Sequence, residues 1–236
     1  MSRIIFVTAT DTGAGKTVLT SLLARSLRDR GLRVAALKPI CSGGRDDARI
    51  LHTALGGELP LDQINPWHFR SPIAPALAAA REKKQLWLAE VLDHIRRLRK
   101  HFDVTLVEGA GGILSPLGED FDSRDLICAL RATPLVVAPN QLGVVNQVRL
   151  TLEALPPGRR ANAVVILRML PTADSSTGSN RRLLERLLVP HLCQLPWLGA
   201  NFDPAAVLRT PGVRRALAAL TDGIQKGAPL SGEACR

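Results

Sequence analysis

Three stretches of this sequence carry residues that could handle the phosphates of a nucleotide, and the first is ATDTGAGKT at residues 9–17. When such a glycine-rich turn opens a helix, its backbone N–H groups and the helix N-terminus bind phosphate oxygens. Lys16 would then reach the β- and γ-phosphates, and the Thr17 hydroxyl would ligate Mg²⁺. The usual pattern has a glycine where Thr10 stands, and an ordinary glycine turn before a helix is the alternative interpretation.

The second stretch is LKPICSGGRDDA at residues 37–48. Lys38 follows an apolar run, so it lies at the carboxyl end of a predicted strand, where its ammonium would point toward the phosphate loop. Ser42 and Gly43 follow in a turn, and Asp47 comes at the start of a predicted helix. Taken alone, Lys38 could be a surface lysine and Asp47 a residue that suits the helix dipole. The neighbouring phosphate loop favours the functional interpretation of both.

The third stretch is TLVEGAGGILSPL at residues 105–117, in which Glu108 ends an apolar run and Gly109-Ala110-Gly111 follows. A carboxylate at the end of a strand beside the phosphate-loop strand suits a Mg²⁺ ligand. Glycines let a ligand approach the backbone closely. The alternative is a turn that ends the strand and leaves an exposed glutamate.

Together the three stretches supply the parts of one phosphoryl-transfer site. Thr17, Asp47 and Glu108 offer three oxygen ligands for one Mg²⁺. Lys16 and Lys38 offer two positive charges over a phosphoryl group in transfer, so such a site would act by positioning and charge stabilisation. The sequence context suggests no Cys-His or Ser-His pairing, which disfavours covalent catalysis.

The elements that must position these residues alternate along the chain. Apolar runs predict strands over 3–8, 33–39, 104–109, 134–139, 163–168 and 193–197. Helical spacing predicts helices over 16–30, 46–55, 85–101, 123–131, 144–155, 179–188 and 203–220, with an irregular segment over 56–84. Continuous apolar strands separated by helices predict one doubly wound, mostly parallel α/β sheet with helices on both faces. We expect a single domain over residues 1–222 and a flexible tail over 223–236, with ligands at the carboxyl ends of the strands.

The composition favours a globular cytoplasmic protein. Hydrophobic residues make up 46% of the 236 residues, which argues against disorder. No apolar run approaches the roughly 20 residues needed to span a bilayer, and the N-terminus does not resemble a signal peptide. Four scattered cysteines read as reduced thiols. We therefore expect no membrane partner.

The formal net charge of +10 raises the question of an anionic partner. The basic residues are spread over several predicted helices, aromatic residues make up only 3% of the chain, and tyrosine is absent. A basic stripe with stacking aromatics, as in many nucleic-acid-binding proteins, is therefore missing. We interpret the charge as a solvated surface and do not expect nucleic acid to be a partner.

The segments VTATDTGAGKT, LKPICSG, DDA, VEGAGGILSPL and QLGVVNQVRLT resemble the signature segments of dethiobiotin synthetases. They come in the order of that family and cover the chain to about residue 155, and a weaker resemblance continues through QLPWLGANFD. The family's loop has five residues between its glycines, so the loop at residues 9–17 resembles this longer variant. Ala9 stands in place of the first glycine, and we expect a slightly different entry to the loop.

The resemblance implies a P-loop NTPase-like fold and an ATP- and Mg²⁺-dependent ligase that closes a ring. Its substrates would be 7,8-diaminononanoate (diaminopelargonate), CO₂ or bicarbonate, and ATP. Lys38, Lys16 and Thr12 would be the catalytic residues. Thr12, Ser42 and Gly111 would contact the diamine or its carbamate. The family works as a homodimer, in which Asn146 of the partner subunit would help to hold the substrate carboxylate; taken alone, Asn146 could be a plain helix N-cap.

The resemblance also implies a nucleotide site that draws on several segments. Its members would be Gly13, Ala14, Gly15, Lys16, Thr17, Val18, Asp47, Glu108, Gly109, Ala110, Gly111, Arg168, Pro196, Trp197, Leu198 and Asp203. Many relatives have an asparagine that reads adenine where Arg168 stands, so a relaxed preference among nucleoside triphosphates is a hypothesis. Pro196, Trp197 and Leu198 would pack against the base, and Asp203 would lie near the ribose.

Two other functions stay open at this point. A divergent relative that carboxylates or phosphorylates another amine or carboxylate would fit Arg168, Gly13 and the short stretch between Ser42 and Asp47. A DNA-bound partitioning-type ATPase has a similar fold and loop, and the basic charge favours it. Such ATPases usually carry an extra lysine early in the loop, whereas residues 10–12 are Thr-Asp-Thr here.

Overall fold

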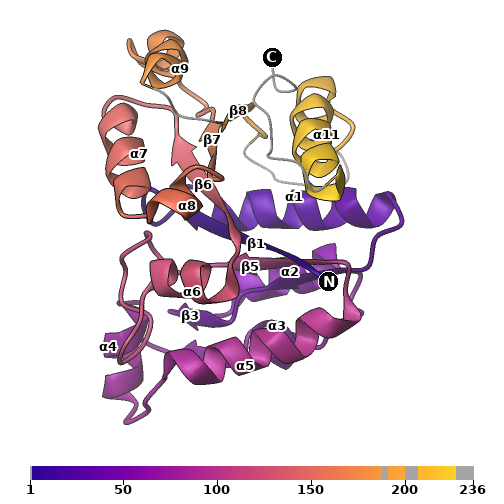
Figure 1. Cartoon of the computed structure of the whole chain (residues 1–236), viewed down its shortest axis with the longest axis vertical. Coiled ribbons are helices and arrows are strands. Elements are labelled where there is room, and N and C mark those ends of the chain that lie inside the picture. Colours follow the sequence, from indigo (N-terminus) through magenta and orange to yellow (C-terminus); the bar gives the residue numbers. More distant parts are fainter. Residues whose placement is uncertain (1, 188–190, 200–206, 227–236) are drawn as a thin grey trace.

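The central element of the molecule is a six-stranded sheet. The computed structural model of the chain describes residues 2–187, 191–199 and 207–226. The strands of the sheet are β1 (Arg3–Ala9), β2 (Val34–Leu37), β5 (Val104–Glu108), β6 (Thr133–Pro139), β7 (Val164–Arg168) and β8 (His191–Leu195). Their order is β2-β5-β1-β6-β7-β8 and every pairing is parallel, as predicted (Figure 1).

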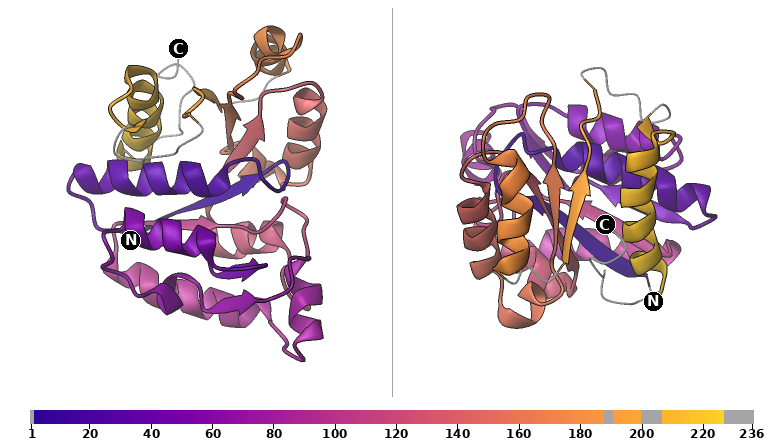
Figure 2. Two further views of the ribbon diagram at one scale, coloured as in Figure 1. Left: turned by 180° about the vertical axis from the view of Figure 1, so that it is seen from behind. Right: turned by 90° about the horizontal axis from the view of Figure 1, so that it is seen from above.

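The strands are mostly apolar and buried because helices cover both faces of the sheet. In β1 every residue from Ile4 to Ala9 is buried, and the Phe6 side chain is fully enclosed. Helices α1 (Lys16–Asp29), α2 (Asp46–Ala54) and α11 (Pro211–Lys226) pack together on one face. The other face carries α5 (Leu88–Leu98), α6 (Ser123–Leu130), α7 (Val144–Glu153) and α9 (Thr177–Arg186). Figure 2 shows α7 and α9 on the opposite side of the strands from α11. Right-handed crossovers produce this arrangement.

The prediction of an irregular segment over 56–84 is wrong. This segment contains α3 (Leu61–Ile64), β4 (Trp67–Phe69) and α4 (Pro75–Arg81), and β4 pairs in parallel with β3 (Ile40–Ser42) in a second, two-stranded sheet. Two prolines of this segment precede or open its helices: Pro60 is the N-cap of α3 and Pro75 begins α4. Proline is tolerated there because the first N–H groups of a helix have no partner within it.

Several predicted boundaries also move. The helix predicted over 85–101 is α5 followed by a 3₁₀ turn η1 (Arg99–His101), and a short helix α8 (Pro157–Arg160) follows α7. The last strand is shifted to the N-terminal side because Pro196 cannot donate to the ladder. The last helix, predicted over 203–220, is α11, which runs to Lys226. The tail boundary at residue 223 therefore falls inside a helix, and the rest of that predicted tail lies outside the described residues.

Many surface arginines lie in local ion pairs. Arg25 pairs with Asp29 at 3.0 Å and Arg181 with Glu185 at 2.9 Å, each one helical turn apart. Such exposed pairs contribute only about 0.3–0.5 kcal/mol each to folding stability, as is typical of a solvated surface. Among the described residues, no helix combines the length and the apolar character that crossing a bilayer requires.

Candidate active site

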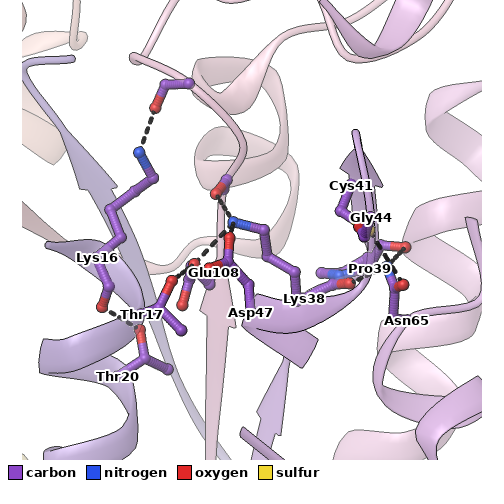
Figure 3. A network of polar contacts seen from close by, with 12 residues as sticks. Lys16, Thr17, Thr20, Lys38, Pro39, Cys41, Gly44, Asp47, Asn65 and Glu108 are labelled. Carbon is purple, nitrogen blue, oxygen red and sulfur yellow. Dashed lines mark hydrogen bonds and ion pairs between the residues drawn. The ribbon is translucent and has the colours of Figure 1, made fainter. Parts of the chain in front are cut away.

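The three predicted stretches converge at one edge of the sheet. In a parallel sheet the carboxyl ends of all strands meet at the same edge. The loop at residues 10–15 follows β1, Lys38 follows β2 and Glu108 ends β5, and these strands are neighbours in the order β2-β5-β1. The side chains of Lys16, Thr17, Lys38, Asp47 and Glu108 therefore gather in one place (Figure 3). This clustering follows from topology, since the residues lie up to 92 positions apart in the chain.

Lys38 forms the centre of a charge cluster in which Lys38 and Glu108 are buried and Asp47 is half-exposed. Its Nζ donates to Glu108 Oε1 at 2.7 Å, to Asp47 Oδ2 at 3.0 Å and to the Gly109 carbonyl at 3.0 Å. Lys38 is 3% exposed and Glu108 1%. The interpretation of Lys38 as a surface lysine and of Glu108 as an exposed residue is therefore wrong. Three acceptors for the three ammonium hydrogens fix the lysine in one position.

The pKa values in the cluster follow from burial and charge. Burial alone would lower the pKa of Lys38, but the carboxylates of Glu108 and Asp47 outweigh it and the pKa is raised. Burial alone would raise the pKa of Asp47, but the ammonium of Lys38 and hydrogen bonds from Lys38 and Thr17 lower it. Lys38 is thus held as a cation and Asp47 as an anion.

The cluster has the donor set of a Mg²⁺ site. The Thr17 hydroxyl donates to Glu108 Oε1 at 2.8 Å, which places the predicted ligands Thr17, Asp47 and Glu108 together. Glu108 Oε2 is buried and has no hydrogen-bond partner, so a strong acceptor is left over in the cluster. Within the described ranges, no group of three or more His, Cys, Asp or Glu side chains is arranged to hold a metal. The predicted set has two carboxylates and a hydroxyl, all hard oxygen ligands that fit Mg²⁺.

The side chain of Lys16 lies across the phosphate loop and binds one backbone carbonyl of that loop and one of the segment after β5. Gly15 is the N-cap of α1 and has a φ of 101°, which glycine adopts without strain. The Lys16 ammonium donates to the carbonyls of Gly111 at 2.9 Å and Asp11 at 3.3 Å. Burial and the positive charge of Lys38 lower the pKa of Lys16 to about 8, against the opposing effect of the carboxylates of Glu108, Asp47 and Asp11.

Arg168 lies against the phosphate loop. This last residue of β7 donates from Nε to the Ala14 carbonyl at 2.7 Å. A Cβ atom built on Gly15 would lie 2.8 Å from Arg168 Cδ, so the arginine stem packs directly over this glycine. Burial lowers the pKa of Arg168, and no carboxylate is among the causes of its shift. The phosphate loop and β7 are therefore connected through one side chain.

The glycine loop after β5 depends on a residue that the sequence analysis did not single out. Gly111 has a φ of 70°, and a Cβ built on it would lie 2.4 Å from Ser115 Oγ. The Ser115 hydroxyl accepts a hydrogen bond from the Gly112 N–H at 2.9 Å. Ser115 thus folds under the loop and holds the Gly111 carbonyl toward Lys16. The sequence signal that could have indicated this contact is Ser115, which follows Gly112 by three residues in a turn-forming run.

The remaining predicted residues lie in several places around this edge. Ala14 is buried, Val18 packs against the core, and Thr12 and Gly13 are exposed on the loop. Ser42 ends β3, and its hydroxyl donates to the Ile73 carbonyl at 2.6 Å.

Asn146 is exposed in the first turn of α7, whose N-cap is Gly143, so the alternative of an Asn146 N-cap is wrong. Pro196, Trp197 and Leu198 follow β8, with Trp197 41% exposed. Asp203 lies outside the described residues.

Comparison with known proteins assigns the chain to a family. A family model described as an AAA domain matches residues 3–203. The ATP-dependent dethiobiotin synthetase BioD of Anaeromyxobacter sp. (strain Fw109-5) is 40% identical over 190 residues, which cover 78% of this chain and 85% of that protein. BioD of Anaeromyxobacter dehalogenans (strain 2CP-C) is 41% identical over 201 residues, which cover 83% and 90%.

Among solved structures, the hydrogenase maturation factor HypB from Archaeoglobus fulgidus shares the fold alone. Its TM-score is 0.55 at 11% identity, with 95% of this chain and 89% of that chain covered. The sequence identity to the two synthetases extends over most of their length and is much higher than the identity to HypB, so it assigns the family more specifically. This AAA-domain chain therefore belongs to the family of ATP-dependent dethiobiotin synthetases.

Proposed function

We propose that this chain joins CO₂ to the two amines of 7,8-diaminononanoate at the expense of ATP and so forms the ureido ring of dethiobiotin. The observation that carries the proposal is the ion-paired cluster of Lys38, Asp47 and Glu108 beside the phosphate loop. A buried carboxylate, a half-exposed carboxylate and a buried lysine suit a reaction in which negative charge moves between a carbamate and a phosphoryl group. Family membership supports an ATP-dependent role in biotin synthesis.

The proposed reaction has three steps. One amine of the diamine attacks CO₂, loses a proton and becomes a carbamate. A carbamate oxygen then attacks the γ-phosphorus of ATP, and ADP leaves, which produces a carbamic–phosphoric anhydride. The second amine attacks the anhydride carbonyl carbon, phosphate leaves, a proton is released and the ring closes.

Lys16 and Lys38 are proposed as the charges that stabilise these steps. Lys16 would exchange its bonds to the Gly111 and Asp11 carbonyls for the β- and γ-phosphates. Lys38, held by two carboxylates, would face the carbamate and the phosphoryl group in transfer. A Mg²⁺ ion held by Thr17, Asp47 and Glu108 would neutralise phosphate charge when bound.

Substrate binding would draw on two copies of the chain. Thr12 lies beside Gly111, since a Cβ on Gly111 would be 4.0 Å from Thr12 Oγ1. We propose that Thr12, Ser42 and the Gly111 backbone bind the diamine or carbamate end. Asn146 of the partner subunit would hold the distant carboxylate in a homodimer, near the N-terminus of α7.

The nucleotide would lie along the phosphate loop, with its β- and γ-phosphates near Lys16 and its base near β7 and the Pro196–Leu198 segment. Arg168 presents only hydrogen-bond donors, whereas the edge of adenine carries both a donor and acceptors. We therefore propose that base selection is relaxed and that CTP and GTP also serve. The position of Arg168 over the loop also favours a second candidate, a relative in which the same machinery acts on another amine or carboxylate.

The test is incorporation of radiolabelled bicarbonate into 7,8-diaminononanoate with Mg²⁺ and ATP, CTP or GTP in parallel. We expect acid-stable label in a product of the mass of dethiobiotin, with none when the diamine or the nucleotide is left out. Lys38→Met is the control variant, in which we expect far less label because the proposed catalytic charge is removed. Folded protein that hydrolyses ATP but produces no acid-stable label with any nucleotide would overturn the assignment of substrate.

A further inference from the structure

Lys38 lies at the point where the chain leaves the main sheet and enters the two-stranded sheet. The pairing of β2 with β5 ends at Leu37, and β3 begins at Ile40. Lys38 and Pro39 bridge the gap between them, and Pro39 has no N–H to donate. The backbone of Lys38 therefore lies outside the strand pairing of both sheets and needs other hydrogen-bond partners to hold it.

The buried amide of Asn65 supplies those contacts. Asn65 is fully buried, and its Nδ2 donates to the Lys38 carbonyl at 2.7 Å and to the Pro39 carbonyl at 3.3 Å (Figure 3). The Lys38 N–H donates to the Ile64 carbonyl at 3.0 Å, so both backbone groups of Lys38 are bound by consecutive residues. Because the carbonyls can only accept, the orientation of the Asn65 amide is fixed by its partners.

The other end of the same amide reaches the segment that carries Asp47. Asn65 Oδ1 accepts from Arg45 Nε at 3.1 Å and from Cys41 Sγ at 3.2 Å. Arg45 is the N-cap residue of α2, and Asp47 is the second residue of that helix. Arg45 Nη2 also donates to the Asn65 carbonyl at 2.9 Å. One side chain thus joins the backbone of Lys38 to the start of the helix that holds its carboxylate partner.

We infer that Asn65 is a positioning residue for catalysis, which holds Lys38 and Asp47 in register through the Lys38 carbonyl and Arg45. The inference rests on the proposed roles of Lys38 and Asp47. Lys38 and Asn65 are buried and Arg45 is mostly buried, and a hydrogen-bonded network of this kind restrains a side chain within a fraction of an ångström. A displacement of about 1 Å can lower a rate by roughly a hundredfold. The Asn65 side chain makes no hydrogen bond to the phosphate loop, so we expect ADP in the absence of Mg²⁺ to bind with unchanged affinity when Asn65 is replaced.

The test uses two variants of the full chain and one matched control. Asn65→Asp has the same shape and keeps the acceptor toward Arg45, but it removes both N–H donors. Asn65→Ala removes the whole amide. The control, Thr221→Val, deletes another fully buried polar group, whose hydroxyl donates to the Leu217 carbonyl on α11, away from the site. Thermal unfolding establishes that each variant is folded.

Two readouts separate positioning from a merely structural role. We expect kcat to fall by roughly tenfold to a hundredfold in both Asn65 variants while the Kd for ADP in the absence of Mg²⁺ stays the same. Thr221→Val should lose a similar amount of thermal stability and retain kcat. Unchanged kcat in a folded Asn65→Ala variant would overturn the inference, and so would equal losses of kcat in Asn65→Ala and Thr221→Val.

The second readout does not require activity. Acetic anhydride labels lysine amines, and mass spectrometry compares the modification of Lys38 with that of exposed Lys100. We expect Lys38 to be protected in the natural chain and to become labelled in both Asn65 variants, but not in Thr221→Val. If the natural chain forms no ring product and this pattern still appears, the proposed function fails and the positioning role holds. Continued protection of Lys38 in both Asn65 variants would overturn that role.

Discussion

Lys38 is the residue whose replacement we expect to reduce activity most. Lys38→Met removes the charge that lies between Glu108 and Asp47 and leaves both carboxylates without their partner. We expect kcat to fall by about 10²–10³ because charge stabilisation at the phosphoryl group is lost. Unfolding in urea should show a loss of about 3–5 kcal/mol, typical of breaking a buried pair. The exposed Lys100→Met is the control, and a Lys38→Met enzyme with full kcat would contradict the assigned role.

Lys16 makes nucleotide binding sensitive to pH. Its pKa is lowered to about 8, so the free protein carries this charge fully near pH 6 and loses it as the pH rises through 8. Because the protonated form attracts phosphates, the affinity for ADP should fall between pH 7 and pH 9. Titrations over this range should show the decline in the natural chain and a flat profile in Lys16→Gln. A flat profile in both would contradict the prediction.

At the scale of elements, the turn that opens α1 tolerates no side chain at Gly15. Gly15→Ala would adopt a φ of 101°, which costs on the order of 1–3 kcal/mol, and its Cβ would meet Arg168 at 2.8 Å. We expect ADP affinity to drop by at least tenfold, as measured by calorimetry.

Two glycines provide the controls for this substitution. Gly13 has a φ of 71° but open space around it, so Gly13→Ala tests the cost of the positive φ without a steric clash. Gly158 also has open space and no positive φ, and Gly158→Ala should bind ADP normally. Equal affinities in the Gly15→Ala and Gly158→Ala variants would show that the loop adapts.

The elements that the sequence predicted best are those with continuous apolar runs or long helical periodicity. All six strands of the main sheet and the helices beside the phosphate loop were predicted, because burial on both faces leaves a clear pattern. The elements of the segment over 56–84 were not predicted, because β4 is three residues long and α3 only four, too short for periodicity. The position of Asn65 could not be predicted for another reason: its amide donates to backbone carbonyls, which any sequence supplies.

The predicted site could be assembled from sequence because parallel topology brings strand ends together, whatever their separation along the chain. Lys16, Thr17, Lys38, Asp47 and Glu108 all follow or end predicted strands or open predicted helices. What the sequence could not provide is the burial of the Lys38 cluster or the contact of Arg168 with Ala14. Both depend on side-chain directions that only packing decides.

At the scale of the whole molecule, α7 leaves apolar side chains in solvent. Leu150 on α7 is 62% exposed, and Leu142 in the preceding turn is 77% exposed. Exposed leucines on a helix and on the turn before it suit a protein interface. We expect a solution mass of twice the 25.4 kDa of one chain, measured by light scattering. Leu150→Glu should shift the mass toward the monomer, whereas Leu77→Glu on α4, at 53% exposure, should not. A monomeric natural chain would contradict the dimer.

The contacts across the carboxyl edge of the sheet also set an order of events during synthesis. The phosphate loop is made first, but Gly111 follows Lys16 by 95 residues and Arg168 follows Ala14 by 154. At 5–20 residues per second, the ribosome takes roughly 8–30 s to deliver that last partner. The full surroundings of the phosphate loop therefore exist only once β7 has been made, and we expect the first half of the chain to be protected by its own core until then.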